Sequence, residues 1–203
     1  AEKQMKSCLV MVGIACLAAS AACGGGPAAS DYDLVVIEAT PGGIACAVRA
    51  AREGLSVLLV NHTRHVGGML TNGLCQWDAL YAGHRAPLFD EYVRRIEDHY
   101  RRTFGEDSPQ YRAARFSMDR YPLGRFEPSV AERQFEELLA AEARITVLRG
   151  YWPTAVERAG SLLHSVRLQA MGGSDARTVR AAVFVDASYE GDLAALAKVP
   201  YRV

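Results

Sequence analysis

The feature that most constrains the fold is a strand–helix–strand pattern in residues 33–60. Residues 34–37 form a continuous apolar run, typical of a strand that is buried on both faces of a parallel sheet. A turn of mostly small residues, 38–43, leads into a helix-like run that ends near Gly54, and a second apolar run covers residues 57–60. This order predicts a βαβ unit. The first backbone N–H groups of its helix would point outward and favour an anion such as a pyrophosphate.

The turn between the first strand and the helix departs from the dinucleotide fingerprint Gly-x-Gly-x-x-Gly. Residues 38–43 read Glu-Ala-Thr-Pro-Gly-Gly, so only Gly43 stands at a fingerprint position. We expect Gly42 and Gly43 to let the phosphates and the sheet come close. Glu38 needs its own explanation, because a carboxylate beside a pyrophosphate is repulsive. It must point away, pair with a cation, or mark a branch of proteins with altered binding.

The end of the second strand carries a further departure from the fingerprint. An acidic residue usually accepts hydrogen bonds from a ribose there, but this chain has Asn61. An amide oxygen can still accept one ribose hydroxyl, and the loss of charge should weaken the contact without abolishing it.

Size and charge limit the classes of partner. The 203 residues carry 23 basic and 23 acidic side chains, for a formal net charge of zero. This balance argues against a large basic surface for nucleic acid. One domain is the default expectation at this length, and a small-molecule or cofactor partner fits better.

The first residues predict a leader and not part of the fold. In residues 1–23, Lys6 precedes a short apolar run, and small residues then lead to Cys23, as in a secretory signal peptide. Cys23 is followed by three glycines and is similar to a bacterial lipoprotein processing site. We therefore expect an exported protein, either periplasmic or held at the membrane only through a lipid anchor at Cys23, with ordinary signal cleavage and an uncleaved anchor as alternatives. Residues 24–31 are expected to be a flexible linker.

Two cysteines, Cys46 and Cys75, follow the leader. They allow one disulfide, but nothing in their spacing requires it. Cys46 falls on the expected inner face of the first helix, which favours a buried free thiol.

Residues 74–127 interrupt the alternation of strands and helices. Apolar residues recur at intervals of three and four in 87–103 and predict a helix with one packed face. Residues 111–121 read as a polar, irregular stretch. Ser129 and Glu132 form a capping box that predicts a helix extending to about residue 142.

The last third of the chain predicts mainly strands. Residues 145–148 continue the parallel sheet. Segments 151–158, 161–169 and 177–185 alternate across glycines as in a three-stranded meander, and the end of the third segment suits the last parallel strand.

Three motifs carry a resemblance to a known family. They begin at Thr40 (Thr-Pro-Gly-Gly-Ile-Ala), at Arg64 (Arg-His-Val-Gly-Gly-Met-Leu-Thr) and at Phe184 (Phe-Val-Asp-Ala-Ser-Tyr-Glu-Gly-Asp-Leu). In this order they resemble the bacterial FAD-dependent oxidoreductases, often exported, that fold like the FAD domain of glutathione reductase. The resemblance covers residues 32–203. It implies an α/β fold: a Rossmann-like FAD-binding domain with a parallel sheet, a crossover β-meander and a helical insertion, truncated before the rest of the family's chain.

The resemblance also implies which residues contact FAD. They are Thr40, Pro41, Gly42, Gly43, Asn61, Arg64, Gly67, Gly68, Met69 and Ser188.

Several polar residues near these motifs keep two readings. Arg64 either meets the pyrophosphate or caps a surface turn, and Asp186 and Asp192 are alternatively helix-capping acids. We interpret His62 and His65 as structural or exposed, because no metal-ligand spacing accompanies them, and we predict no metal site.

The implied activity is hydride transfer from a small or carbohydrate-like substrate to FAD. No catalytic base is assigned, although His84 and the Arg and Tyr side chains of residues 81–121 are candidates. Whether the truncated chain is active alone stays open. The alternative is a non-catalytic nucleotide-binding or interaction module of degenerate Rossmann type, which Glu38 and Asn61 support. A polysaccharide lyase would need a different scaffold, and the βαβ opening argues against it.

Overall fold

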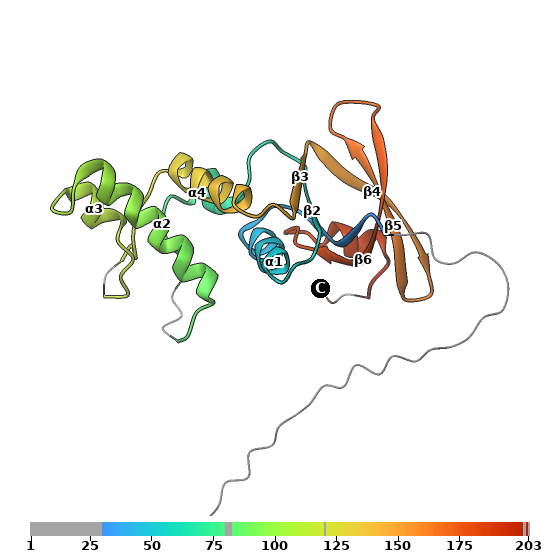
Figure 1. The fold of residues 1–203 in the computed structure, drawn as a ribbon, viewed down its shortest axis with the longest axis horizontal. Helices are drawn as coiled ribbons and strands as arrows, with labels where there is room; N and C mark the ends of the chain where they lie inside the picture. The colour runs from blue at the N-terminus through green and yellow to red at the C-terminus, as the bar shows by residue number, and fades with distance from the viewer. Residues whose placement is uncertain (1–29, 80–82, 120, 201, 203) are drawn as a thin grey trace, which may run out of the picture.

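The structure, a computed structural model, describes residues 30–79, 83–119, 121–200 and 202. The expected leader and nearly all of the expected linker lie outside the described residues. Figure 1 shows a sheet with α1 and α4 beside it, while α2 and α3 extend away from the sheet beyond α4. None of the helices in the described part is long and apolar enough to cross a membrane.

One six-stranded sheet holds the fold together, in the order β3-β2-β1-β6-β5-β4. Its strands are β1 (Tyr32–Ile37), β2 (Val57–Asn61), β3 (Ile145–Arg149), β4 (Tyr151–Ala159), β5 (Leu162–Ala170) and β6 (Ala176–Asp186). β1 runs parallel to β2 and β6, and β2 runs parallel to β3. β5 runs antiparallel to β4 and β6. The predicted α/β fold with a parallel sheet and a crossover meander is confirmed.

β6 belongs to both halves of the sheet. Its first residues pair antiparallel with β5, where Ser165 lies opposite Arg180. Its remaining residues pair parallel with β1, from Tyr32 opposite Ala181 to Ile37 opposite Asp186. The end of the meander is therefore also the last parallel strand.

The apolar run of β1 is continuous because both faces of the strand are covered. Leu34 and Val36 face a core that includes residues of α1 and α4. Val35 and Ile37 face a second core with Val166 and other residues of the meander. A strand with one solvated face would show alternating apolar and polar residues instead.

Helix α1 (Pro41–Arg52) starts where the sequence places the turn. Thr40 is its N-cap, and Pro41 occupies the first helical position, where the missing N–H costs nothing. Gly43 is buried, and a Cβ there would overlap the carbonyl oxygen of Glu38, so only glycine fits this position. This is the role of the last fingerprint glycine, which brings helix and strand close together.

The segment between β2 and β3 is helical. It contains the short π-helical turn η1 (Leu70–Leu74), α2 (Pro87–Phe104), α3 (Pro109–Ala114) and α4 (Pro128–Ala140). Trp77 is 2% exposed and contacts the rings of Phe89, Tyr92, Phe116 and Phe126. The predicted α2 and the helical insertion are confirmed.

Residues 111–121 were expected to be irregular, and this expectation is wrong for residues 111–114. They belong to α3, whose N-cap Ser108 accepts a hydrogen bond from the N–H of Tyr111 at 3.1 Å. Pro109 at the first helical position adds a start signal.

The predicted capping box at Ser129 and Glu132 is also wrong. α4 begins at Pro128 with Glu127 as its N-cap, so Ser129 is already inside the helix. The Glu132 carboxylate is therefore free to accept hydrogen bonds from the backbone N–H of Val66, at 3.2 Å, and from the ring of His65, at 3.0 Å.

Both cysteines of the described part are free and partly buried. Cys46 packs against the core, and its burial raises the pKa of its thiol. The expected free thiol is confirmed, although it is less buried than expected.

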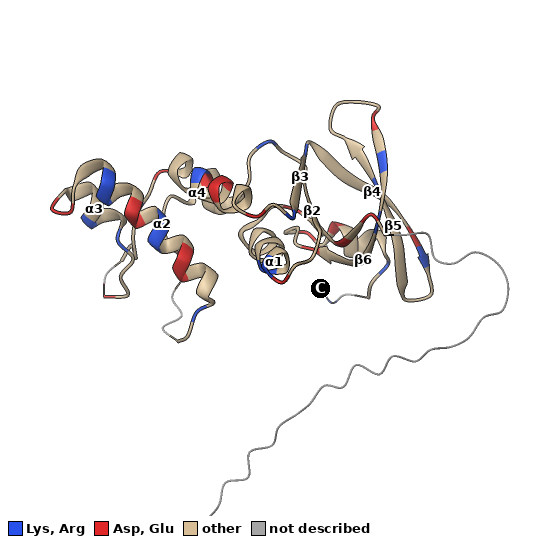
Figure 2. Cartoon of the chain, in the orientation of Figure 1, with Lys and Arg blue, Asp and Glu red and all other residues tan. Residues whose placement is uncertain are grey.

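Charged side chains tie the helices together at the surface. Figure 2 shows Lys and Arg alternating with Asp and Glu along α2. Arg52, at the end of α1, donates to Glu91 of α2 at 2.8 Å and to Glu142, just after α4, at 2.6 Å.

Candidate nucleotide site at the strand ends

The carboxyl ends of β1, β2 and β6 meet at one edge of the sheet. The N–H of Glu38, just after β1, donates to the carbonyl oxygen of Val60 at 2.8 Å. The N–H of Ala187, just after β6, donates to the carbonyl oxygen of Ile37 at 2.9 Å. In open α/β sheets, ligands bind outside this edge.

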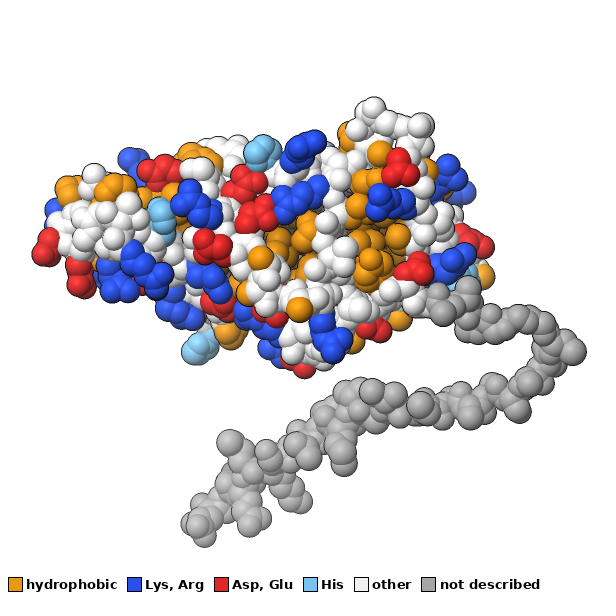
Figure 3. All heavy atoms as spheres, turned by 45° about the horizontal axis from the view of Figure 1, so that its top comes forward, with side chains coloured by type: hydrophobic (Ala, Val, Ile, Leu, Met, Phe, Trp, Pro, Cys, Tyr) orange, Lys and Arg blue, Asp and Glu red, His pale blue; other side chains and the backbone are white. Residues whose placement is uncertain are grey.

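A hollow of about 650 Å³ lies at this edge, and we call it the strand-end hollow. It is lined by Glu38, Asn61, His62, Thr63, His65, Gly68, Met69, Asn72, Trp152, Met171, Tyr189, Glu190 and Asp192. Polar groups thus mix with large apolar side chains, of which Met69, Met171 and Tyr189 are more than half exposed. Figure 3 shows apolar side chains gathered near the middle of the visible face, with charges of both signs around them.

Helix α1 starts close to this edge. The Thr40 hydroxyl accepts from the N–H of Gly43 at 3.1 Å and donates to the carbonyl oxygen of Ala187 at 2.9 Å. Pro41 has no N–H to offer. The N–H of Gly42, an exposed residue, has no partner among the described residues. It is therefore the group at this helix end that is open to an anion.

The Asn61 side chain joins two turns. Its Oδ1 accepts from the N–H of Ala39 at 2.9 Å, and its Nδ2 donates to the carbonyl oxygens of Thr63, at 3.2 Å, and His65, at 2.6 Å. Asn61 is 3% exposed. Most of its hydrogen-bonding capacity is thus used by the protein, and its contact with a ribose stays a prediction.

Glu38 lines the strand-end hollow and is 7% exposed. Its φ is 81°, a left-handed conformation that is unusual for a residue other than glycine. Its Oε1 accepts from the backbone N–H of His62 at 3.1 Å and lies 2.9 Å from Nδ1 of the same residue. The structure thus places the Glu38 carboxylate beside His62, at the end of β2.

His62 connects this carboxylate to the wall of the hollow. Its ring meets the ring of Trp152 edge-on, with centroids 5.2 Å apart. His62 and His65 are both exposed at the surface, and each ring lies beside one carboxylate. In the described ranges, 30–79, 83–119 and 121–200, no three potential ligands gather as a metal site would require.

The glycines after β2 have packing roles. A Cβ on Gly67 would overlap Thr71, and a Cβ on Gly68 would overlap the hydroxyl of Tyr189. That hydroxyl accepts from the N–H of Met69 at 2.9 Å. Gly67 is therefore required by the packing of the protein itself, whereas a Cβ on Gly68 would displace only the exposed end of Tyr189. The contact of both glycines with FAD stays a prediction.

Ser188 organises the turn after β6. Its hydroxyl donates to Asp186 Oδ1 at 2.6 Å and accepts from the N–H groups of Gly191, at 2.9 Å, and Asp192, at 3.0 Å. Asp186 Oδ2 accepts from the N–H of Ala194 at 2.8 Å and so caps α5 (Asp192–Leu196). The helix-capping alternative holds for Asp186, whereas Asp192 is the first residue of the helix and not its cap.

Arg64 is exposed and does not line the strand-end hollow. Its carbonyl oxygen accepts from Arg149 at 2.7 Å, and Arg149 also pairs with both oxygens of Glu136 at 2.6 Å. These contacts attach the turn to α4 and favour the surface-turn reading.

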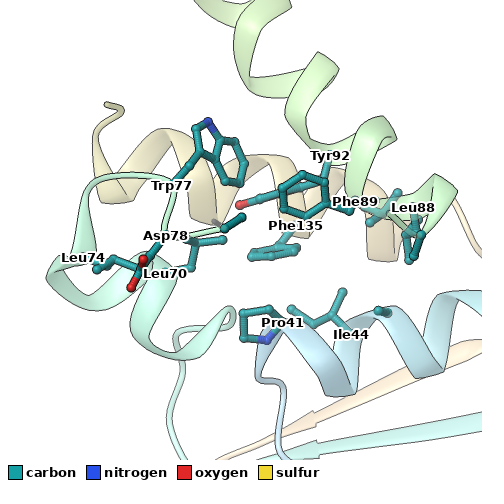
Figure 4. A pocket seen from close by; sticks show the side chains of 14 residues that line it. Pro41, Ile44, Leu70, Leu74, Trp77, Asp78, Leu88, Phe89, Tyr92 and Phe135 are labelled. Atoms are coloured by element: carbon teal, nitrogen blue, oxygen red, sulfur yellow. The ribbon is translucent and has the colours of Figure 1, made fainter. Parts of the chain in front are cut away.

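A second cavity, the apolar pocket, has a volume of about 270 Å³. It is lined by Pro41, Ile44, Ala45, Leu70, Leu74, Trp77, Asp78, Ala79, Ala86, Leu88, Phe89, Tyr92, Phe135 and Leu138. Figure 4 shows Pro41 and Ile44 of α1 on one side and Phe89, Tyr92 and Phe135 on the other. Sequence reasoning missed this pocket, although the apolar face of α2 was its signal.

The start of α1 lies between the two cavities. Pro41 lines the apolar pocket and Gly68 lines the strand-end hollow. A Cβ on Gly68 would be 3.3 Å from Cδ of Pro41. The strand-end hollow and the apolar pocket are thus adjacent, with Gly68 and Pro41 packed together between them.

Of the candidate catalytic side chains, Tyr92 lines the apolar pocket, and none of those in the described residues lines the strand-end hollow. His84 is exposed and lines neither cavity. Arg112 and Arg115 line a separate hollow near α3. Tyr81 falls outside the described residues.

The residues at the strand ends fit an adenine dinucleotide in most respects. An open N–H at Gly42 suits a phosphate, and the rings of Trp152 and Tyr189 beside the hollow suit a planar base. Asn61, the expected ribose partner, is largely used by the protein. The acidic residue that usually binds the ribose from the end of β2 is therefore missing at position 61.

The fold and this edge define a nucleotide-binding α/β protein. The family described as FAD dependent oxidoreductase matches residues 33–203. The chain therefore belongs to this family, whose cofactor is FAD. No curated protein sequence matches the chain.

Solved structures support the fold. AlpK superimposes with a TM-score of 0.52 at 19% identity, over 83% of this chain and 33% of its own. The glycerol-3-phosphate dehydrogenase from Bacillus halodurans, complexed with FAD, gives a TM-score of 0.52 at 14% identity, over 82% of this chain and 36% of its own. Sdh1 of Mycobacterium smegmatis, in complex with UQ1, gives 0.50 at 19% identity, over 82% and 37%. The chain thus spans about a third of the length of these proteins.

Proposed function

We propose that this chain is the FAD-binding part of an oxidoreductase that acts on a small-molecule substrate. The observation that carries the proposal is the meeting of the strand-end hollow and the start of α1 at the edge where α/β proteins bind nucleotides, in a chain of an FAD-dependent family. Hydride transfer from a substrate carbon to flavin N5 is the chemistry that bound FAD supplies.

The chain's own residues would bind and orient the cofactor. The N–H of Gly42 and the positive end of the α1 dipole would hold the pyrophosphate. Trp152 and Met171, which line the strand-end hollow, would contact the adenine. A glutathione-reductase-like binding mode is part of this proposal.

Flavin binding is the test of this function. The purified protein is expected to be yellow or to quench the fluorescence of added FAD. Substrates are then screened without oxygen for loss of the flavin absorbance bands. A colourless protein that leaves FAD fluorescence unchanged would contradict the proposal.

A non-catalytic nucleotide-binding module is the second candidate. It is favoured by the Asn61 amide, which the protein uses for its own turns. Such a module would bind FAD or ADP, but no tested substrate would bleach the flavin.

Export is proposed from residues 1–23, with a lipid on Cys23. Cys23→Ser in the full chain is expected to move the protein from the membrane fraction to the soluble fraction. An unchanged distribution would contradict the lipid anchor.

A further inference from the structure

The backbone of Glu38 is strained, and its hydrogen bonds to His62 do not by themselves explain the strain. A residue with a Cβ at φ 81° is strained, and glycine would adopt this backbone freely. Strain of this kind concentrates at binding and active sites. The position is also the first of the dinucleotide fingerprint, where glycine is expected.

The carboxylate of Glu38 reaches the end of β2. Its Oε1 is held there by the N–H of His62 at 3.1 Å and lies 2.9 Å from the ring of His62. His62 directly follows Asn61, the position from which an acid usually meets the ribose. The chain therefore brings a carboxylate to the expected ribose region from β1 instead of β2.

The second oxygen of this carboxylate is available. Glu38 lines the strand-end hollow, and no described residue hydrogen-bonds its Oε2. A carboxylate oxygen accepts strong hydrogen bonds from hydroxyl groups. Asn61, by contrast, already uses its Oδ1 for Ala39 and its Nδ2 for carbonyl oxygens.

We propose that Glu38 is the ribose-binding acid of this chain, with its Oε2 accepting hydrogen bonds from the hydroxyls of the adenosine ribose. This inference rests on the proposed function and adds a specificity-determining residue to it. The hydrogen bonds from His62 fix Oε1 and so orient Oε2. The carboxylate then contributes attraction to the ribose that outweighs its repulsion of the pyrophosphate.

The test compares ADP with 2′,3′-dideoxy-ADP, which lacks both ribose hydroxyls, by titration calorimetry on the full chain. The variant is Glu38→Gln, because an amide keeps the acceptor for the His62 N–H but replaces Oε2 with a donor. Wild-type protein is expected to bind ADP about tenfold or more tightly than the dideoxy compound, as for a hydrogen bond to a charged acceptor. Glu38→Gln is expected to lose this preference and to bind both compounds alike.

Two further variants serve as controls for this test. Glu38→Gly restores the expected glycine, should fold without backbone strain, and is expected to lose the same preference. Glu137→Gln removes one exposed charge from α4, outside the hollow, and should leave both affinities unchanged. Thermal unfolding of each variant checks that the fold is intact.

The outcomes separate this inference from the proposed function. If Glu38→Gln binds ADP more tightly, or keeps the full preference for it, the carboxylate is not the ribose acid, although FAD binding still stands. If the wild-type protein binds neither FAD nor ADP, both proposals fail.

Discussion

The side chain of Asn61 hydrogen-bonds the backbone of Ala39, and so fixes the turn after β1 against the turn after β2. The distance from Ala39 N to Asn61 Oδ1 is 2.9 Å, and both residues are buried. Asn61 also holds the carbonyl oxygens of Thr63 and His65. One amide therefore joins two turns beside the strand-end hollow, which Asn61 itself lines.

Asn61→Asp tests this structural role. The carboxylate can still accept from Ala39, but it cannot donate to the two carbonyl oxygens, which would then face a charge. We expect a loss of about 1–3 kcal/mol in the free energy of unfolding at neutral pH, measured in urea. Lowering the pH to protonate the new carboxylate should recover part of the loss, and unchanged stability would contradict the role.

Gly43→Ala and Gly42→Ala form a matched pair at the start of α1. A Cβ on Gly43 would overlap the carbonyl oxygen of Glu38, whereas a Cβ on Gly42 would meet its nearest neighbour, the Thr40 hydroxyl, at 3.8 Å. Gly43→Ala should therefore cost about 2 kcal/mol or more. Gly42→Ala should keep the fold and weaken FAD binding, as seen in fluorescence quenching. Equal stability of the two variants would argue against the observed packing.

Thr40→Val removes a hydroxyl that both caps α1 and reaches the turn after β6. The expected loss is about 1–2 kcal/mol, because a helix cap and a buried acceptor both lose their partner. Thr40→Ser keeps the hydroxyl and serves as the control. Chemical denaturation of both variants decides the matter, and a Val variant as stable as the Ser variant would contradict it.

Arg52 makes stability depend on pH. Its guanidinium donates to the Glu91 carboxylate and holds the pKa of that group below its ordinary value. A lowered folded-state pKa stabilises the fold above the unfolded pKa of about 4.3, and this stabilisation is lost as the pH falls through the folded value. Arg52→Gln should cost about 1 kcal/mol at pH 7 and less in acid.

The control for this pH experiment lies one turn earlier in α1. Arg49 pairs with Glu53 on the surface, with side chains that are 75% and 57% exposed. Arg49→Gln should change the stability by less than about 0.5 kcal/mol at any pH. Equal effects of the two substitutions in urea titrations would show that the Arg52 ion pairs stabilise the fold no more than the exposed Arg49–Glu53 pair does.

Much of the sheet can be predicted from the sequence, because burial on both faces leaves continuous apolar runs. β1 and β2 are recognisable for that reason, and the meander by its alternation across glycines. The start of α4 was missed because Ser129 and Glu132 match a capping pattern, while Pro128 takes the first helical position one residue earlier.

The site is less predictable than the sheet. The sequence identifies Glu38 and Asn61 as departures from the fingerprint, but not what each side chain does. The left-handed backbone of Glu38 and the position of His62 decide where the carboxylate goes. Both depend on how two turns, more than twenty residues apart, are packed together.

The pairing of β1 with β6 has a consequence for synthesis of the chain. Asp31 and Arg180, which share a hydrogen bond beside this pairing, are 149 positions apart. During translation, the apolar edge of β1 can form no bonds with β6 until nearly the whole described chain has left the ribosome. Contacts of such long range slow folding and leave a strand edge exposed to aggregation. Nascent chains that end before residue 176 should therefore need a chaperone to stay in solution.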